Sequence, residues 1–317
     1  MPKKMISVVI PCYRSQNTIG QVIERVRATI EKDGRYDHEI ICVNDYSPDN
    51  VLEVLRDIAK TDDRVRVISL SRNFGQHGAL MAGFHYVRGD IVLCLDDDGE
   101  TPPENMFMLI DKLVEDDYDL VSAKYPSDKR KWYRAIGSKI SFAMSSILVG
   151  KPKEIELNSF YTFRSYILKE VLRYNNPYPF VHGLILRVTR NMANVEMKRA
   201  ERLEGESGYT FRKLIRLWLN GFTAFSEKPL RIATYLGVIS SIGGFLAAII
   251  VLIKRIQRPD MPVGYASTMI VMLFLFGIMM LTLGMLGEYI GRMYISINNA
   301  PQFVVKEEIN VREKKDE

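Results

Sequence analysis

A run of acidic residues directly follows an apolar stretch of the chain. Asp96, Asp97 and Asp98 come after Ile91–Leu95, and Glu100 follows one residue later. Adjacent carboxylates repel one another strongly unless a cation lies among them. On an extended strand end, Asp96, Asp98 and Glu100 would share one side, and such oxygen ligands suit Mg²⁺ or Mn²⁺, which also bind substrate phosphates. We therefore predict a divalent-cation site at these three residues; a solvated acidic turn is the alternative interpretation.

Two further loops carry side chains suited to a nucleotide. Val43–Asn50 is rich in acidic and hydroxyl groups that can hydrogen-bond a base and a ribose, although Asx-type turns use the same residue types. In Ser71–Gly83, Gly75 and Gly78 permit a tight turn into a helix. A helix start beside Arg72 favours an anion, so we predict that Arg72 contributes to binding a nucleotide.

A later segment, Arg199–Thr210, places arginine and serine around a glycine. A planar guanidinium group can pair with two phosphate oxygens at once. We therefore expect Arg202 and Ser207 to contact a phosphate. Glutamates are interspersed in the same segment, and an ordinary exposed loop is the alternative.

The loops must be positioned by the segments between them. These segments are short, β-branched apolar runs, typical of strands, which alternate with stretches typical of amphipathic helices. Strands alternating with helices predict an α/β fold, with a mostly parallel sheet and helices on both of its faces. Ligands of such sheets bind beyond the carboxyl ends of the strands, where the acidic run falls. The expected strands are Ile6–Ile10, Glu39–Val43, Val65–Leu70 and Ile91–Leu95, and the expected helices are Thr18–Ile30, Asn50–Ile58 and His77–Val87.

The bulk composition restricts the function only a little. The chain has 317 residues and a formal net charge of +5, which suits nucleic acid and a membrane surface alike. It has no dense basic stripe and no recognised nucleic-acid module, so we expect no nucleic-acid partner. Cys12, Cys42 and Cys94 lie in or beside apolar runs, without metal or disulfide spacing, which indicates a reducing compartment.

Two uncharged apolar stretches lie near the C-terminus, at Ala233–Ile253 and Tyr265–Gly287. Each is long enough to cross a membrane as a helix. We predict a transmembrane hairpin with both chain ends on one side; a buried hairpin in a soluble core is the alternative. The link Lys254–Gly264 is basic, but the flanking segments carry more Lys and Arg, so the positive-inside tendency places the main domain in the cytoplasm.

Two other stretches, Trp132–Val149 and Tyr209–Phe225, mix Arg and Lys with aromatic residues. This pattern is typical of helices that lie in the membrane interface. Ordinary amphipathic packing helices are the alternative. The adjacent apolar hairpin favours the interfacial interpretation.

Taken in order, these motifs resemble the family 2 glycosyltransferases, specifically the branch that acts on polyprenyl phosphates. The resemblance covers nearly the whole chain, and the ordered set is far more specific than any single motif. Its segments are ISVVIPCYRSQNTI (Ile6–Ile19), VNDYSPDN (Val43–Asn50), SRNFGQHGALMAG (Ser71–Gly83), GDIVLCLDDDGETPPE (Gly89–Glu104), GESGY (Gly205–Tyr209) and LGEYIGRMY (Leu286–Tyr294).

The resemblance implies a GT-A fold whose acidic strand end holds Mg²⁺ or Mn²⁺ against the diphosphate of the donor. Catalysis would then depend on Asp98 and Arg202. The implied roles are Pro11, Tyr13 and Asp45 for the nucleoside, Asp96 and Asp97 for the ribose and phosphate, Asp98 and Glu100 for the metal, and Arg202 and Ser207 for a donor or acceptor phosphate.

The implied activity is inverting transfer of a sugar from a nucleotide sugar, a UDP-hexose or UDP-N-acetylhexosamine, to a polyprenyl phosphate such as undecaprenyl phosphate. It would take place at the cytoplasmic face of the cell membrane and serve cell-envelope glycans. A glycolipid or a growing polysaccharide is the alternative acceptor. Further expected partners are membrane lipid and other copies of the chain, in a tetramer-like homo-oligomer.

The implied domain order is a GT-A catalytic domain at 1–208, an interfacial region at 209–231, two transmembrane helices within 232–290 and a cytoplasmic tail at 291–317. The two spans would cover about 233–253 and 265–287.

A non-catalytic membrane scaffold is an alternative to an enzyme. Such a scaffold would have little use for the clustered Asp96–Asp98, which favours the enzyme.

The sequence departs from the family at several positions, and the most important departure concerns a proposed base. The family's Asp-Phe-Arg segment, which carries a proposed base, reads NSFYTFR at Asn158–Arg164, so Ser159 stands in place of the aspartate. A hydroxyl acceptor needs a general base, whereas a lipid phosphate is already anionic and reacts once oriented. We therefore expect a phosphate acceptor, and little loss of activity in Ser159→Ala.

Overall fold

The computed structural model describes residues 3–125, 155–177, 179–198, 200, 228–257, 264–298 and 300–311. The chain forms two compact units, one made of Met1–Thr210 with Asn299–Glu317 and the other of Phe211–Asn298. The expected interfacial helices at Trp132–Val149 and Tyr209–Phe225 lie outside the described residues.

An eight-stranded sheet forms the centre of the first unit, in the order β7-β5-β6-β4-β1-β2-β3-β8. Strands β1 to β4 are parallel to one another, whereas β6 and β8 run antiparallel to their neighbours. The mostly parallel sheet predicted from the sequence is confirmed, including all four expected strands. The bounds are β1 Met5–Cys12, β2 Asp37–Asn44, β3 Val65–Leu70, β4 Ile91–Cys94, β5 Leu120–Lys124, β6 Tyr161–Arg164, β7 Met192–Glu196 and β8 Val305–Ile309.

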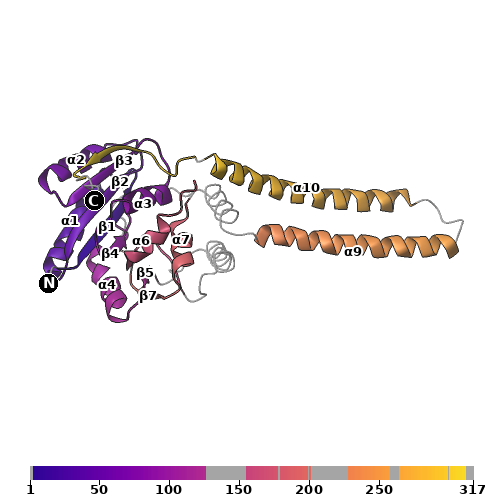
Figure 1. Cartoon of the computed structure of the whole chain (residues 1–317), viewed down its shortest axis with the longest axis horizontal. Coiled ribbons are helices and arrows are strands. Elements are labelled where there is room, and N and C mark those ends of the chain that lie inside the picture. Colours follow the sequence, from indigo (N-terminus) through magenta and orange to yellow (C-terminus); the bar gives the residue numbers. More distant parts are fainter. Residues whose placement is uncertain are drawn as a thin grey trace. The chain divides into compact units, whose positions relative to one another are not determined.

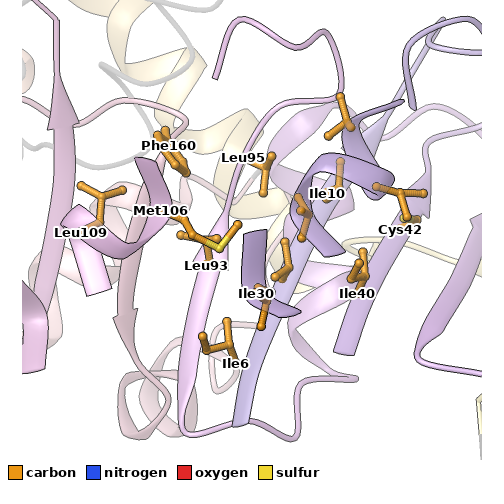
Figure 2. Close-up of a cluster of buried hydrophobic side chains, with 14 of the residues drawn as sticks. Ile6, Ile10, Ile30, Ile40, Cys42, Leu93, Leu95, Met106, Leu109 and Phe160 are labelled. Carbon is orange, nitrogen blue, oxygen red and sulfur yellow. The ribbon is translucent and has the colours of Figure 1, made fainter. Parts of the chain in front are cut away.

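One face of this sheet is covered by α1 (Ile19–Asp33), α2 (Val51–Thr61) and α4 (Met106–Glu115), with the short 3-10 helix η1 (Pro103–Asn105) before α4. Helix α1 buries apolar side chains at three- and four-residue spacing and ends at Gly34, whose φ of 70° is the left-handed conformation that favours glycine. Figure 2 shows Ile30 of α1 and Met106 of α4 packed over the strand residues Ile6, Ile10 and Leu93. Each such side chain contributes about 1.5–3 kcal/mol when fully buried.

The opposite face carries α3 (Gln76–Phe84), with α6 (Tyr166–Val171) and α7 (Val181–Val188) further along the sheet. Helix α3 lies close to β1 and β2 because Gly83 faces the sheet. A Cβ atom at Gly83 would lie 2.7 Å from Val9 Cγ1 and 3.0 Å from Val43 Cγ2. Helices therefore cover both faces, as predicted.

The second unit contains two long helices, α9 (Lys228–Gln257) and α10 (Tyr265–Ile297), which pack side by side (Figure 1). Within α10, Phe274–Gly291 is long and apolar enough to cross a membrane, and α9 contains the shorter apolar stretch Gly237–Leu246. Large apolar side chains such as Ile239 and Phe245 are exposed along these helices. Extensive exposed apolar surface marks a contact with lipid or with another protein.

The segment after α10 lies within the range 291–317, which we expected to form a cytoplasmic tail, and it contains a strand. Helix α10 continues to Ile297, and β8 then pairs antiparallel with β3 at the edge of the sheet. The Arg56 guanidinium donates to both carboxylate oxygens of Glu307, at 3.1 and 2.6 Å. Strand β8 alternates half-buried and exposed residues, so it covers a sheet edge that would otherwise present unpaired backbone groups.

Candidate active site

The carboxyl ends of β1, β2 and β4 meet at one edge of the sheet. The backbone N–H of Asp45 donates to the carbonyl of Cys12 at 3.1 Å, which joins the ends of β2 and β1. The backbone N–H of Tyr13 donates to Oδ2 of Asp97 at 2.8 Å, and the Thr18 hydroxyl donates to the Asp97 carbonyl at 2.7 Å. The fold thus brings together three loops that the sequence singled out separately.

The acidic run forms a turn, and not the continued strand that we predicted. Strand β4 ends at Cys94, and the chain bends at Gly99, whose φ is +77°. The backbone N–H of Glu100 donates to Oδ1 of Asp98 at 3.0 Å, which closes the turn. The expected alternation of Asp96, Asp98 and Glu100 is therefore wrong, and within the described residues no three His, Cys, Asp or Glu side chains form a ready-made metal-ligand group.

The carboxylates of this turn nevertheless affect one another electrostatically. The pKa of Asp96 is raised to about 6, mainly by burial and also by the negative charges of Asp98, Asp97 and Glu100, while the hydrogen bond from Ser159 acts in the opposite direction. Burial likewise raises the pKa of Asp97 to about 6. Negative charge confined in this way favours a bound cation, so the residues fit a divalent metal that takes its other ligands from a diphosphate.

Asp96 has a donor on each of its two carboxylate oxygens. The Gln76 side-chain amide donates to Oδ1 at 3.0 Å, and the Ser159 hydroxyl donates to Oδ2. Gln76 opens α3, and Ser159 lies just before β6. Neither contact could be predicted from the sequence, because they join residues 20 and 63 positions apart.

Asp45 is buried at the end of β2, and its side chain binds the backbone of the loop before α3. Its two carboxylate oxygens accept hydrogen bonds from the backbone N–H groups of Phe74 and Gly75, at 2.7 and 2.8 Å. Burial raises the pKa of Asp45 to about 6, while these two hydrogen bonds act in the opposite direction. The Asp45 carboxylate is therefore directed toward the loop before α3. A nucleoside could contact it, as predicted, only through oxygens that already accept these two hydrogen bonds.

The other predicted nucleotide contacts lie around this edge. Pro11 is half-buried in β1, and Tyr13 is 43% exposed just beyond it. The guanidinium of Arg14 lies 5.6 Å from the Tyr13 ring centroid. Arg72 is exposed and its guanidinium lies 4.7 Å from the ring centroid of Phe74. An exposed aromatic ring with a flanking cation suits stacking on a base.

Arg202 and Ser207 lie outside the described residues. The chain that leads to them is described at Ala200, whose backbone N–H donates to the carbonyl of Glu100 at 3.1 Å. Ala200 therefore lies beside the acidic turn, although the two are about a hundred residues apart in the sequence.

Comparison with known proteins decides the family. The model of the glycosyl transferase family 2 matches residues 7–181, and that of the GtrB C-terminal hairpin matches residues 228–293. The chain belongs to glycosyl transferase family 2. It is 32% identical over 310 residues to the uncharacterized glycosyltransferase YkcC of Bacillus subtilis, covering 98% of this chain and 95% of that one.

Two transferases named for undecaprenyl phosphate are similar to the chain over a comparable length. The undecaprenyl-phosphate 4-deoxy-4-formamido-L-arabinose transferase of Serratia proteamaculans is 34% identical over 308 residues, covering 96% of this chain and 94% of its own. That of Proteus mirabilis is 32% identical over 310 residues, covering 97% and 94%. The family resemblance predicted from the motifs is confirmed, and this family 2 chain is a glycosyltransferase.

Solved structures show the same fold as this family 2 chain. Glucosyl-3-phosphoglycerate synthase from Mycobacterium tuberculosis, in complex with Mn²⁺ and uridine-diphosphate-glucose, superposes with a TM-score of 0.51 at 21% identity, covering 74% of this chain and 78% of its own. A complex of that enzyme with Mn²⁺, uridine diphosphate and phosphoglyceric acid gives 0.52 at 21% identity, covering 68% and 75%. The predicted GT-A fold is confirmed.

Proposed function

We propose that this family 2 glycosyltransferase moves a sugar from a nucleotide sugar to a polyprenyl phosphate at the cytoplasmic membrane face, with inversion at the anomeric carbon. The observation that carries the proposal is the half-buried carboxylate turn at the carboxyl edge of the sheet. It occurs in a chain similar, over almost its whole length, to transferases named for undecaprenyl phosphate. A UDP-hexose or UDP-N-acetylhexosamine is the proposed donor, since an enzyme of the same fold holds uridine-diphosphate-glucose.

The proposed donor site combines the acidic turn with the loops after β1 and β2. Asp98 and Glu100 would hold Mg²⁺ or Mn²⁺, and Asp96 lies beside them. When bound, the cation stabilises the charge that develops on the departing nucleoside diphosphate. Tyr13 and Pro11 would line the nucleoside, and Arg72 and Asp97 would lie near its phosphates or ribose.

Arg202 and Ser207 are proposed to bind a phosphate of the donor or the acceptor. Ala200, which lies two residues before Arg202 in the sequence, donates its backbone N–H to the carbonyl of Glu100, and this contact supports the proposal. A guanidinium group there would bind a phosphate through two parallel hydrogen bonds. Such positioning supplies catalysis when the nucleophile needs only orientation.

No general base is assigned to this reaction. A polyprenyl phosphate is anionic near neutral pH and can attack the anomeric carbon once it is oriented. Single displacement of the nucleoside diphosphate inverts that centre. The Ser159 hydroxyl, which the motif comparison placed at the position of the family's proposed base, donates a hydrogen bond to Asp96, and a neutral hydroxyl is too weakly basic to serve as a general base.

A donor screen with the full-length protein in membranes tests this activity. We expect release of nucleoside diphosphate with one UDP-sugar only when Mn²⁺ or Mg²⁺ and a short polyprenyl phosphate are both present. The product should be a lipid-linked sugar of inverted anomeric configuration, measured by NMR after extraction. The matched control is the corresponding polyprenyl alcohol, which lacks the phosphate. Equal transfer to the alcohol, or transfer only to a glycolipid or polysaccharide, would contradict the proposed acceptor.

The chain connectivity supports a membrane hairpin with both ends on one side. The chain leaves the unit containing β1–β7 before α9 and returns to it after α10, because β8 belongs to the same sheet. If α9 and α10 both cross the membrane, the link between them lies on the far side. We propose that the link is extracytoplasmic and that the catalytic unit is cytoplasmic.

Cysteine labelling checks this topology. Native Cys12, Cys42 and Cys94 are buried, so they should give little background. With a membrane-impermeant maleimide, Asp260→Cys in the link should react in intact cells. Lys306→Cys, at an exposed position of β8, should react only after the cells are permeabilised. Labelling of Lys306→Cys in intact cells would rule out the proposed orientation.

A further inference from the structure

Both oxygens of the Asp96 carboxylate are held by neutral donors, the amide of Gln76 on Oδ1 and the hydroxyl of Ser159 on Oδ2. A carboxylate offers about four acceptor positions. Two hydrogen bonds therefore orient the group and leave further positions for a ligand. Because neither donor carries a charge, the negative charge of Asp96 remains available to a cation.

The two donors come from segments that the fold itself holds in place. Gln76 follows the loop whose backbone N–H groups, at Phe74 and Gly75, donate to the buried Asp45. These two hydrogen bonds fix the start of α3, and therefore the position from which the Gln76 side chain contacts Asp96.

Ser159 is held from its other side. The backbone N–H of the preceding residue, Asn158, donates to the Ser122 hydroxyl at 3.1 Å, and the Asn158 side-chain amide donates to the carbonyl of Ala123 at 2.7 Å. Nε2 of His182 lies 3.2 Å from the Asn158 carbonyl oxygen. The Ser159 hydroxyl is thus presented to Asp96 by a chain segment anchored to β5 and α7.

We propose that Ser159, assisted by Gln76, is a positioning residue that orients Asp96 toward a divalent cation and the donor diphosphate. The inference rests on the proposed function. An aspartate at position 159 would place a second negative charge against Asp96, whereas the serine supplies a hydrogen bond.

This inference reverses our expectation that Ser159→Ala costs little. Substitution of residues that orient a metal-binding side chain commonly weakens metal affinity by about 10- to 100-fold. We expect that loss for Ser159→Ala, since the contact is partly buried. Gln76→Ala should lose less, because the Gln76 amide is exposed and water can replace its hydrogen bond.

The test measures binding without turnover. Mn²⁺ is titrated into the full-length protein in detergent with uridine diphosphate and no acceptor, and free Mn²⁺ is followed by electron paramagnetic resonance. Ser165→Ala, a serine at the start of α6 away from the acidic turn, is the matched control and should bind as the wild type does. Ser159→Thr, which retains the hydroxyl, should recover most of the lost affinity.

A double-mutant cycle separates orientation of Asp96 from general damage. In an Asp96→Asn background, Ser159→Ala should cause no further loss of Mn²⁺ affinity, because its partner is already altered. An equal loss in both backgrounds would overturn the inference, as would unchanged affinity in Ser159→Ala. Failure of the wild-type protein to bind Mn²⁺ with uridine diphosphate would instead overturn the proposed donor site, and this inference with it.

Discussion

Asp98→Ala is expected to abolish sugar transfer, lowering kcat by about 1,000-fold or more. Asp98 is half-buried in the turn after β4, and its charge raises the pKa of neighbouring Asp96, which places the two carboxylates within electrostatic reach. Electrostatic stabilisation of a leaving group by a bound cation is worth several kcal/mol, and each 1.36 kcal/mol changes the rate tenfold. The measurement is single-turnover transfer from the UDP-sugar identified in the donor screen.

Two comparisons distinguish loss of the metal ligand from loss of the fold. Asp98→Asn keeps the shape of the side chain but removes its charge, so it should be nearly as inactive as Asp98→Ala. Asp57→Ala removes a carboxylate that is 74% exposed on α2 and should transfer sugar at the wild-type rate. Near-normal turnover in Asp98→Ala, with an unchanged Tm, would show that the metal site has been assigned wrongly.

Glu39→Ala is expected to lower the free energy of unfolding by about 3–5 kcal/mol, because it leaves the buried charge of Arg66 without its carboxylate partner. The Arg66 guanidinium donates to Oε2 of Glu39 at 2.8 Å, and the two side chains are only 4% and 7% exposed. Oε1 accepts hydrogen bonds from the Ser7 hydroxyl at 2.6 Å and from the backbone N–H of Arg88 at 2.7 Å. All three donors lose their acceptor in the variant, which is costly in a buried site.

The matched control for Glu39→Ala is Glu196→Ala. Glu196 forms an ion pair with Lys124 at 3.0 Å, but its side chain is 72% exposed, and exposed pairs contribute about 0–1 kcal/mol. Thermal or denaturant unfolding in detergent should therefore separate the two variants clearly. Glu39 and Arg66 lie near the amino-terminal ends of β2 and β3, opposite the carboxyl edge. For this reason kcat of the folded Glu39→Ala fraction should be unchanged, and equal stability of the two variants would contradict the argument.

The parts of the fold that depend on local patterning could be predicted from the sequence. The runs Ile6–Ile10 and Val65–Leu70 are short, β-branched and buried, and each coincides with a strand. Helix α2 was expected because its apolar residues recur every three to four positions, and it begins at Val51. Strand β8 was not expected, because its VKEEI sequence is short and charged and gains its stability from pairing with β3.

The sequence by itself determined which family the chain belongs to, and it supplied the residues that we propose to carry the chemistry, since both depend on contiguous motifs such as Asp96–Glu100. Only the tertiary structure decided how those side chains are directed. The turn at Gly99 replaced a continued strand, the carboxylate of Asp45 points into the loop before α3, and Ser159 reaches Asp96 from another strand. The physical reason is that strand and helix periodicity is a local property of the chain. A hydrogen bond between residues 63 positions apart exists only after packing has brought their backbones together.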